Sequence, residues 1–346
     1  MIYVDGVPFA PANSSQVTDI LMALMEHPVL VTASNEFKSM TEKKLSYSDS
    51  KNSRWVYLFQ REFATVDPKL VDLAGTDEAT TCVCIAIRNR KSGMISVGHM
   101  DFPGIVDMGL SQMLSLVADQ DCDNLLEVHL MGGFDDRLSL KPYPAMKTKT
   151  KMEGYSRPLC VKIIETLRKR SEKFQIQILH VLGRNTKWDS EGIAKPIFHG
   201  IVVETATGSI FPASFDRTSR CPDEIVRRIR LASCFEDPSW AGKLLDTYDT
   251  TKDCFVISPC AWTIWQKETA QSLKNLSDIE ILLTRSSSPS AEGPDFVYNE
   301  RRIADYLIAH PDWQETFPGR KPRVFQRAAD GAWITMKDYC SRALRD

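Results

Sequence analysis

Short apolar runs and helix-spaced apolar positions follow one another along the chain without a regular order. Runs rich in β-branched and aromatic side chains predict strands over 55–63, 79–88, 94–100, 125–131, 174–182, 197–205 and 254–258. Apolar side chains three and four positions apart predict helices over 104–120, 157–173, 223–233 and 295–309. Because these elements do not alternate as regular βαβ units, we expect an α+β fold, a sandwich of largely antiparallel sheet layered with helices.

The pattern does not divide the chain into separate units. We expect residues 1–346 to form a single domain whose core covers about 55–330. Two polar and charged segments, 34–54 and 141–157, are expected to be exposed insertions. The tract 286–293, with the sequence SSSPSAEG, has the composition of a loop or linker.

The two strands between 79 and 100 predict a hairpin that brings a thiol to an imidazole. If 89–92 form a four-residue loop, Cys82 lies directly opposite His99. Facing side chains of an antiparallel pair have Cβ atoms about 4.5–5.5 Å apart. An imidazole at that distance can lower the pKa of the thiol, and the resulting thiolate is a nucleophile. A shift of one residue in the register would turn His99 to the other face.

Other interpretations of these residues stay open at this point. A cysteine in an apolar strand is commonly a small core residue, and a histidine at a strand end is commonly a structural hydrogen-bond donor. A zinc site could use Cys82, Cys84, His99 and His129. The two cysteines are separated by a single residue and no second pair follows, which disfavours a structural zinc site.

Composition and charge exclude several classes of function. The 43 basic side chains nearly balance the 45 acidic ones, so nucleic acid is not expected as a main partner. No apolar stretch approaches the about 18 residues of a membrane span, and the first residues lack the features of a signal peptide. The nine cysteines have no framework spacing, which predicts reduced thiols in the cytoplasm, with the nucleus as a second location.

Longer segments carry a resemblance to a known family. GTDEATTCVCIAIRNRKSGMISVGHMD (75–101) and LLEVHLMGGFDDR (125–137) resemble the protein N-terminal asparagine amidohydrolase family. Weaker similarity continues in IFHGIVVET, IFPASFD, SPCAWT and PDFVYNERRIADYLIAHP, so the resemblance covers about 55–330. The family has Ser where Thr76 stands, and it has one more residue in the segment that corresponds to 133–136.

The resemblance implies an enzyme that hydrolyses the side-chain amide of an N-terminal asparagine to aspartate and ammonia. It implies no cofactor and no metal. Its implied partners are proteins with N-terminal asparagine and, downstream in the N-degron route to proteolysis, an arginyltransferase. The family is distantly similar to bacterial chemoreceptor glutamine deamidases and Rho-deamidating toxins, which share a Cys–His core on an αβ sandwich.

The same resemblance assigns roles to particular residues. Cys82 is expected to be the nucleophile and His99 the base and later the acid, because the cysteine and histidine of those deamidases are also seventeen residues apart. The deamidases carry Thr or Ser six residues before the cysteine, and this position is Thr76 here. The thiolate would attack the amide carbon and form a thioester that water hydrolyses.

Two further groups are expected in such a site. Backbone N–H groups near Thr81 and around Gly132–Gly133 are candidates to bind the oxyanion. A carboxylate is the natural partner of the substrate's α-ammonium group, and Asp77 is our first candidate because it adjoins Thr76 and is acidic in the family. The other acidic candidates are Glu78, Asp101, Glu127, Asp135 and Asp136.

The specificity for asparagine comes from the resemblance alone. Glutamine is longer by one methylene, which a pocket rejects by only about 1–3 kcal/mol through contact energy. Two alternatives therefore remain. One is a deamidase of N-terminal glutamine or of internal amides on the same core, and the other is a non-catalytic protein that binds N-terminal residues.

Overall fold

The computed structural model describes residues 1–346 except 11–16, 47–52, 119–123, 139–153 and 337–346. Within these ranges the largest element is a sheet of eight strands in the order β15-β5-β8-β7-β9-β10-β1-β2. The strands are β1 Ile2–Val4, β2 Val7–Pro8, β5 Glu62–Val66, β7 Val83–Asn89, β8 Ile95–Met100, β9 Leu125–Phe134, β10 Lys173–Leu182 and β15 Leu245–Asp246. The pairs β5–β8, β8–β7 and β7–β9 are antiparallel, whereas β10 runs parallel to both of its neighbours and β15 runs parallel to β5.

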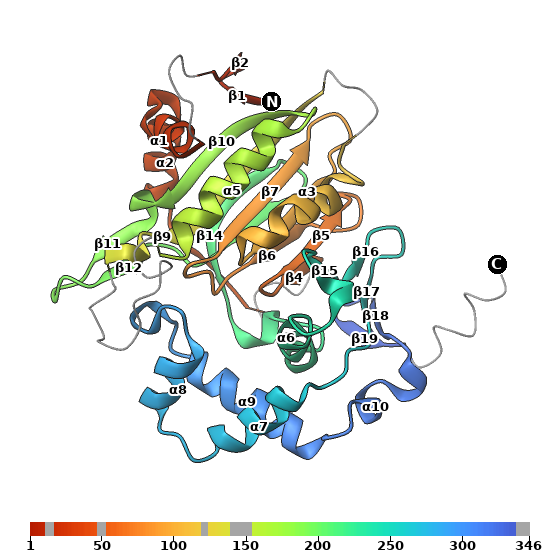
Figure 1. Ribbon diagram of the computed structural model, residues 1–346. Helices are drawn as coiled ribbons and strands as arrows, with labels where there is room; N and C mark the ends of the chain where they lie inside the picture. Colours follow the sequence, from red (N-terminus) through yellow and green to blue (C-terminus); the bar gives the residue numbers. More distant parts are fainter. Residues whose placement is uncertain (11–16, 47–52, 119–123, 139–153, 337–346) are drawn as a thin grey trace.

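A second sheet covers one face of the large one. Its order is β3-β14-β13-β6-β4, with β3 Lys43–Leu45, β4 Trp55–Leu58, β6 Leu73–Thr76, β13 Ile201–Glu204 and β14 Ser209–Phe215. Helices α1 Val17–Glu26, α3 Val106–Leu114 and α5 Ser156–Lys169 pack on the other face (Figure 1). The layers are thus helix, sheet and sheet, which confirms the expected α+β sandwich of largely antiparallel strands.

The alternation of side chains along β7 separates the two hydrophobic cores. Cys84 and Ala86 point to the second sheet and share a cluster with Ile201. Ile85 and Ile87 point the other way, into the cluster beneath the helices. A strand that is buried on both faces reads as a continuous apolar run, and this explains the pattern from Ala79 onward.

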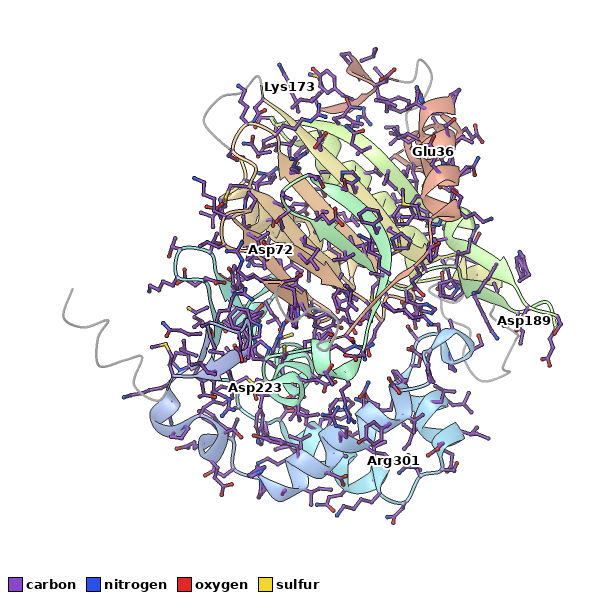
Figure 2. All side chains as sticks on the ribbon, turned by 180° about the vertical axis from the view of Figure 1, so that it is seen from behind. Glu36, Asp72, Lys173, Asp189, Asp223 and Arg301 are labelled. Carbon is purple, nitrogen blue, oxygen red and sulfur yellow. The ribbon has the colours of Figure 1, made fainter. Side chains whose placement is uncertain are left out.

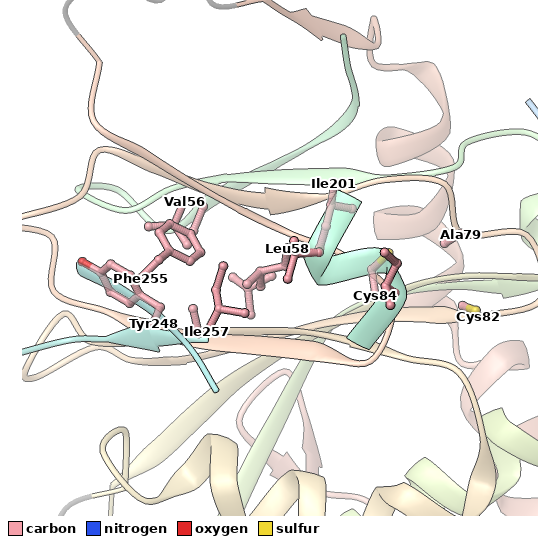
Figure 3. Packing of buried hydrophobic residues seen from close by; sticks show 14 of the residues in the cluster. Val56, Leu58, Ala79, Cys82, Cys84, Ile201, Tyr248, Phe255 and Ile257 are labelled. Carbon is pink, nitrogen blue, oxygen red and sulfur yellow. The ribbon is translucent and has the colours of Figure 1, made fainter. Parts of the chain in front are cut away.

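The C-terminal part adds helices and a third sheet to the core between the sheets. Its elements are α6 Glu224–Ser233, α7 Ile264–Leu273, α8 Asp278–Arg285, α9 Phe296–Ala309, α10 Trp313–Thr316, β16 Tyr248–Asp249, β17 Cys254–Ile257, β18 Arg323–Arg327 and β19 Trp333–Thr335. Phe255 and Ile257 pack in one cluster with Val56 and Leu58 (Figure 3). Figure 2 shows Asp223 where the C-terminal helices meet the sheets, and there it forms an ion pair with Arg323.

The remaining described elements lie at the edge of the sandwich. They are α2 Pro28–Ser39, the hairpin β11 Thr186–Trp188 with β12 Ala194–Pro196, and several short 3-10 turns. No single helix in the described ranges is long and apolar enough to cross a membrane, while α1 and α2 together, bent by 65°, meet that length and composition.

Some expected boundaries were wrong. The strand expected over 55–63 is split into β4 and β5 by a turn in which Arg61 has a φ of +65°. The insertion expected over 34–54 begins inside α2, where Phe37 is fully buried, and β3 pairs with β14. Most of the insertion expected over 141–157 falls outside the described residues. The tract 286–293 joins α8 to α9 and contains a 3-10 turn, Pro289–Ala291.

Two glycines let β9 approach the start of β7 closely. Gly132 and Gly133 have φ angles of +121° and +47°, in the left-handed region that favours glycine. A Cβ atom on Gly132 would lie 2.4 Å from the carbonyl oxygen of Cys82. The N–H of Gly133 donates to that same oxygen at 2.7 Å. The double glycine therefore fixes the backbone that carries Cys82.

We expect Gly132→Ala to destabilise the protein by about 2–4 kcal/mol, because the new methyl group clashes with backbone and the φ angle becomes strained. Gly192→Ala is the matched control, since Gly192 also has a positive φ of +73° but has no atom within 4 Å of the added Cβ. The control should lose only about 1 kcal/mol. Urea unfolding of both variants measures the difference, and equal losses would contradict a close approach at Gly132.

Candidate active site

The hairpin forms as expected, but its register differs by two residues. Cys84, and not Cys82, lies directly opposite His99. The loop starts one residue later than expected, because Asn89 still pairs with Met94 and its side-chain oxygen accepts from two N–H groups inside the loop. Gly93 closes the turn with a φ of +75°. A shift of two residues keeps the same face, so Cys82 and His99 still point to the same side of the sheet.

Cys82 lies immediately before β7, at one end of the cluster between the two sheets (Figure 3). Its side chain is 7% exposed. Its Cβ atom is a diagonal neighbour of that of His99, at a typical separation of about 7–8 Å, which a thiol and an imidazole ring can bridge. No hydrogen bond to Cys82 Sγ occurs within the described ranges. The register thus places a nearly buried thiol and the ring of His99 on one face of the sheet, as diagonal neighbours.

Thr76 and His99 join the two sheets by a buried hydrogen bond. Thr76 Oγ1 on β6 lies 2.7 Å from Nδ1 of His99 on β8. The other ring nitrogen, Nε2, is buried and has no partner within the described part of the chain. Since most buried polar atoms are hydrogen-bonded, this nitrogen is available to a substrate or to the neighbouring thiol. The structure therefore joins Thr76 to His99 and places Cys82 on the same face of the sheet as His99.

Burial keeps the thiol and the imidazole neutral in the free protein. It raises the pKa of Cys82 well above the ordinary value of a thiol, and the charges of Asp101 and Glu292 act in the same direction. Burial also lowers the pKa of His99 to about 4, although the charges of Asp101 and Glu78 oppose that shift. Desolvation disfavours the charged form of each group. The resting pair is then a neutral thiol and a neutral imidazole, rather than a thiolate with an imidazolium.

Asp77 is fully engaged inside the protein. Its Oδ1 accepts from the hydroxyl of Tyr57 at 2.6 Å, and its Oδ2 accepts from the N–H of Phe215 at 2.7 Å and from Arg220 at 3.0 Å. Burial raises the pKa of Asp77 to about 6, and Arg220 opposes that shift. These contacts connect the strand end at Thr76 to the second sheet. Both oxygens of Asp77 are thus occupied within the protein, which disfavours our first candidate for binding an α-ammonium group.

Of two other expected binding residues, one is already paired with an arginine and the other lies far from Cys82. Asp101 is buried and pairs with Arg61 Nε at 3.1 Å. Glu127 pairs with Arg88, which lies six residues along β7 from Cys82 and thus about 20 Å away. Glu127 does not belong to this site.

Gly133 and Thr81 lie beside Cys82, but their contacts differ from those expected. The N–H of Gly133 is taken by the carbonyl oxygen of Cys82, so it is not free to bind an oxyanion. The hydroxyl of Thr81 lies 3.3 Å from the hydroxyl of Ser287. This contact brings the tract 286–293 to the residue next to Cys82.

That tract contributes a carboxylate that the sequence did not reveal. Glu292 is half-buried, accepts a hydrogen bond from Ser286, and is close enough to Cys82 for its charge to raise the pKa of the thiol. Burial raises the pKa of Glu292 itself to about 7. In sequence it lies 210 residues after Cys82, in a Ser-rich segment typical of a linker. Only a family motif that includes this position could have indicated Glu292 from the sequence.

Glu78, next to Asp77, is held by cations. Arg220 donates to it at 2.6 Å and Arg228 at 2.9 Å. Burial opposes the ionisation of Glu78, but the two guanidinium groups keep its pKa below the usual value. Its backbone has a φ of +61°, which is uncommon for a residue with a side chain. Of the other acidic candidates, Asp135 accepts hydrogen bonds from Arg137. Asp136 accepts from the backbone N–H groups of Tyr155 and Ser156, where α5 begins.

The zinc alternative finds no support in the arrangement of these side chains. His129 lies opposite Ala86, two positions farther along β7 than the Cys84–His99 pair. Across the described ranges there is no group of three or more His, Cys, Asp or Glu side chains that could hold a metal ion.

We expect the alkylation of Cys82 by iodoacetamide to accelerate about tenfold per pH unit from pH 7 to pH 9, because only the thiolate reacts and its pKa is raised. Limited access to the thiol would lower the whole curve without changing its slope. Peptide mapping by mass spectrometry separates Cys82 from the other cysteines. A rate that has already levelled off at pH 7 would show a thiolate–imidazolium pair instead.

Comparison with known proteins places this geometry in a family. The chain matches the protein N-terminal asparagine amidohydrolase family over residues 45–335. It is 56% identical to the protein N-terminal asparagine amidohydrolase of Arabidopsis thaliana, over 96% of this chain and 99% of the relative. The mouse and human proteins of the same name are 29% and 28% identical, each over 80% of this chain and 83% of the relative. The resemblance carried by 75–101 and 125–137 is thereby confirmed, and the chain belongs to the protein N-terminal asparagine amidohydrolase family of enzymes.

Proposed function

We propose that this protein hydrolyses the side-chain amide of an N-terminal asparagine in proteins and peptides. The products are N-terminal aspartate and ammonia. The observation that carries the proposal is the buried Thr76–His99 hydrogen bond beside Cys82, in a chain of this family. Relatives with the name of this activity are similar over most of the chain.

In the proposed mechanism His99 acts first as a base. Its Nδ1–H donates to Thr76 Oγ1, which leaves the lone pair of Nε2 free to take the proton of the Cys82 thiol. The sulfur attacks the amide carbon of asparagine, and the carbonyl electrons move to the oxygen. A histidine with a low pKa accepts this proton only as the S–C bond forms, so the charge develops in the transition state.

The second half of the reaction returns both groups to their starting state. The imidazolium gives its proton to the amide nitrogen, which leaves as ammonia, and a thioester remains on Cys82. His99 then takes a proton from water, and the hydroxide attacks the thioester carbon. The C–S bond breaks to release aspartate, and the imidazolium returns its proton to the sulfur, which regenerates the thiol. The backbone N–H groups of Thr81 and Cys82 are the proposed donors to the oxyanion, since that of Gly133 is occupied.

We also propose the context that the family resemblance implies. The N-terminal aspartate is a substrate for arginylation, so an arginyltransferase and the N-degron route would act downstream of this enzyme. The proposed location is the cytoplasm, with the nucleus as a second location, because free thiols predominate there.

Short peptides incubated with the wild-type protein and with Cys82→Ala test the reaction. We expect deamidation of a peptide with free N-terminal asparagine, and a loss of about 10⁴-fold or more in the variant. Mass spectrometry detects the gain of one mass unit. Glu127→Gln is the control, because Glu127 lies at the far end of β7 and should leave turnover unchanged.

The other peptides of the set separate the alternatives. Turnover of N-terminal glutamine or of internal asparagine would support amide hydrolysis at this site but contradict the proposed specificity for N-terminal asparagine. Binding of the asparagine peptide without turnover of any peptide would favour the non-catalytic protein.

The role of Thr76 is tested by comparing two substitutions. Thr76→Ser keeps the hydroxyl and should retain most of the activity, whereas Thr76→Val leaves Nδ1 of His99 unpaired and should lower kcat by about 10- to 100-fold. Steady-state kinetics give kcat and KM, and thermal unfolding checks that both variants are folded. If the two variants had equal kcat, the hydroxyl would not orient the imidazole.

A further inference from the structure

The tract 286–293 is fixed onto the residues that flank Cys82. One contact is the pair of hydroxyls of Thr81 and Ser287, 3.3 Å apart. The second runs through His199, whose Nε2 lies 3.2 Å from the carbonyl oxygen of Ala291 and whose own carbonyl oxygen accepts from the N–H of Ala79. The loop before Cys82 and the tract are thus held to the same histidine.

Apolar contacts hold the other side of the tract. Ala291 is 5% exposed and packs with Phe134, which directly follows the double glycine of β9. The N–H of Phe134 in turn donates to the carbonyl oxygen of Thr80. The residue after Ala291 is therefore placed beside the chain that carries the thiol, and that residue is Glu292.

Glu292 has no cationic partner among the described residues. Its hydrogen bond comes from the hydroxyl of Ser286, which carries no charge. Burial raises its pKa to about 7, and the charges of Glu78 and Glu300 act in the same direction. A half-buried carboxylate that lacks a cation is costly, and a ligand that carries one would stabilise it.

The other carboxylates around Cys82 already have such partners. Asp77 and Glu78 are bound by Arg220, and Asp101 is bound by Arg61. Glu292 is the acidic group of this site that is left to bind a cation from outside.

A second observation points to a polar ligand in the same place. Ser288, in the middle of the tract, is 5% exposed, and its Oγ has no hydrogen-bond partner within the described ranges. Nε2 of His99 is buried and unpartnered as well. Buried polar atoms without partners are rare in folded proteins, so Ser288 Oγ, in the tract that contacts Thr81, and His99 Nε2 are candidates to meet a substrate.

We propose that the carboxylate of Glu292 binds the α-ammonium group of the substrate's N-terminal residue, and this inference rests on the proposed function. In asparagine the α-nitrogen and the amide carbon are separated by only two carbon atoms. The ammonium partner must therefore lie next to the nucleophile, where the charge of Glu292 acts on Cys82.

The same contact accounts for two kinds of selectivity. An internal or acetylated asparagine has an amide in place of the ammonium group and gains no ion pair with Glu292. N-terminal glutamine can form the ion pair, but its amide carbon is then displaced by roughly one carbon–carbon bond, about 1.5 Å. A displacement of about 1 Å can lower the rate by a factor of about 10².

Glu292→Gln tests the proposal because glutamine has the same shape and can still accept from Ser286. Two peptides are compared, one with free N-terminal asparagine and one in which hydrogen replaces the α-ammonium group. We expect kcat/KM for the first to fall by about 10- to 100-fold, mainly through KM, while that for the second stays within about twofold. Glu127→Gln is the control, because Glu127 is paired with Arg88, about 20 Å along β7 from Cys82.

The outcomes separate this proposal from the proposed function. An unchanged preference for the ammonium group in Glu292→Gln, or an equal loss for both peptides, would overturn the role of Glu292. Absence of turnover by the wild-type protein would overturn the proposed function instead. In that case calorimetry tests the role of Glu292 by measuring how tightly the asparagine peptide binds to Cys82→Ala and to the double variant Cys82→Ala/Glu292→Gln. An affinity about 10-fold weaker in the double variant supports ammonium binding by Glu292. Circular dichroism confirms that each variant is folded.

Discussion

The face-to-face packing of the two sheets is the constraint on which the site depends. Thr76 comes from one sheet and His99 from the other, and their hydrogen bond of 2.7 Å exists only while the sheets are held at this distance. The core between the sheets supplies that distance, because it is filled from Cys82 at one end to Phe255 at the other (Figure 3). Close-packed interiors have little compressibility, so the orientation of the imidazole is set by the packing as well as by the hydroxyl.

The ion pairs around this core hold the loops that carry the reacting groups. Asp77 and Glu78, directly after Thr76, are both bound by Arg220, which comes from the segment after the second sheet. Gly132 and Gly133 let β9 bind the backbone of Cys82 from the opposite side. The thiol is thus fixed by β9 on one side, by the ion pairs at Asp77 and Glu78 on a second, and by the tract at Thr81 on a third. A nucleophile needs such rigidity to distinguish two amide carbons whose positions differ by one bond length.

The layers of the fold and the shared face of Cys82 and His99 could be predicted from the sequence, because side chains alternate with a period of two in a hairpin. The register was wrong by two residues, and the error kept the face because two is a full period. The internal contacts of Asp77 could not be predicted, for a different reason. Its partner Arg220 lies 143 residues away, and no local pattern indicates that such a pair forms.

Glu292 could not be found in this way, since 286–293 has the composition of a linker and becomes part of the site only through contacts with Thr81 and His199. Sequence composition describes how a segment behaves alone, whereas these contacts are made by elements that lie far apart along the chain. The role of Thr76 came from the resemblance to the family, because a contact between two sheets leaves no periodic signal in the sequence.

The electrostatics of the site connect recognition to reactivity. In the free protein burial is the largest cause of the raised pKa of the thiol, and the negative charge of Glu292 adds to it. In the proposed complex an ammonium group offsets that charge, and the same binding event that positions the amide carbon also makes the sulfur easier to deprotonate. The effect is greatest where water is excluded, because charges interact more strongly in a medium of low dielectric constant. A ligand without the ammonium group leaves the repulsion in place. Under this proposal the thiol is least reactive when the site is empty and becomes more reactive when a substrate supplies the missing cation.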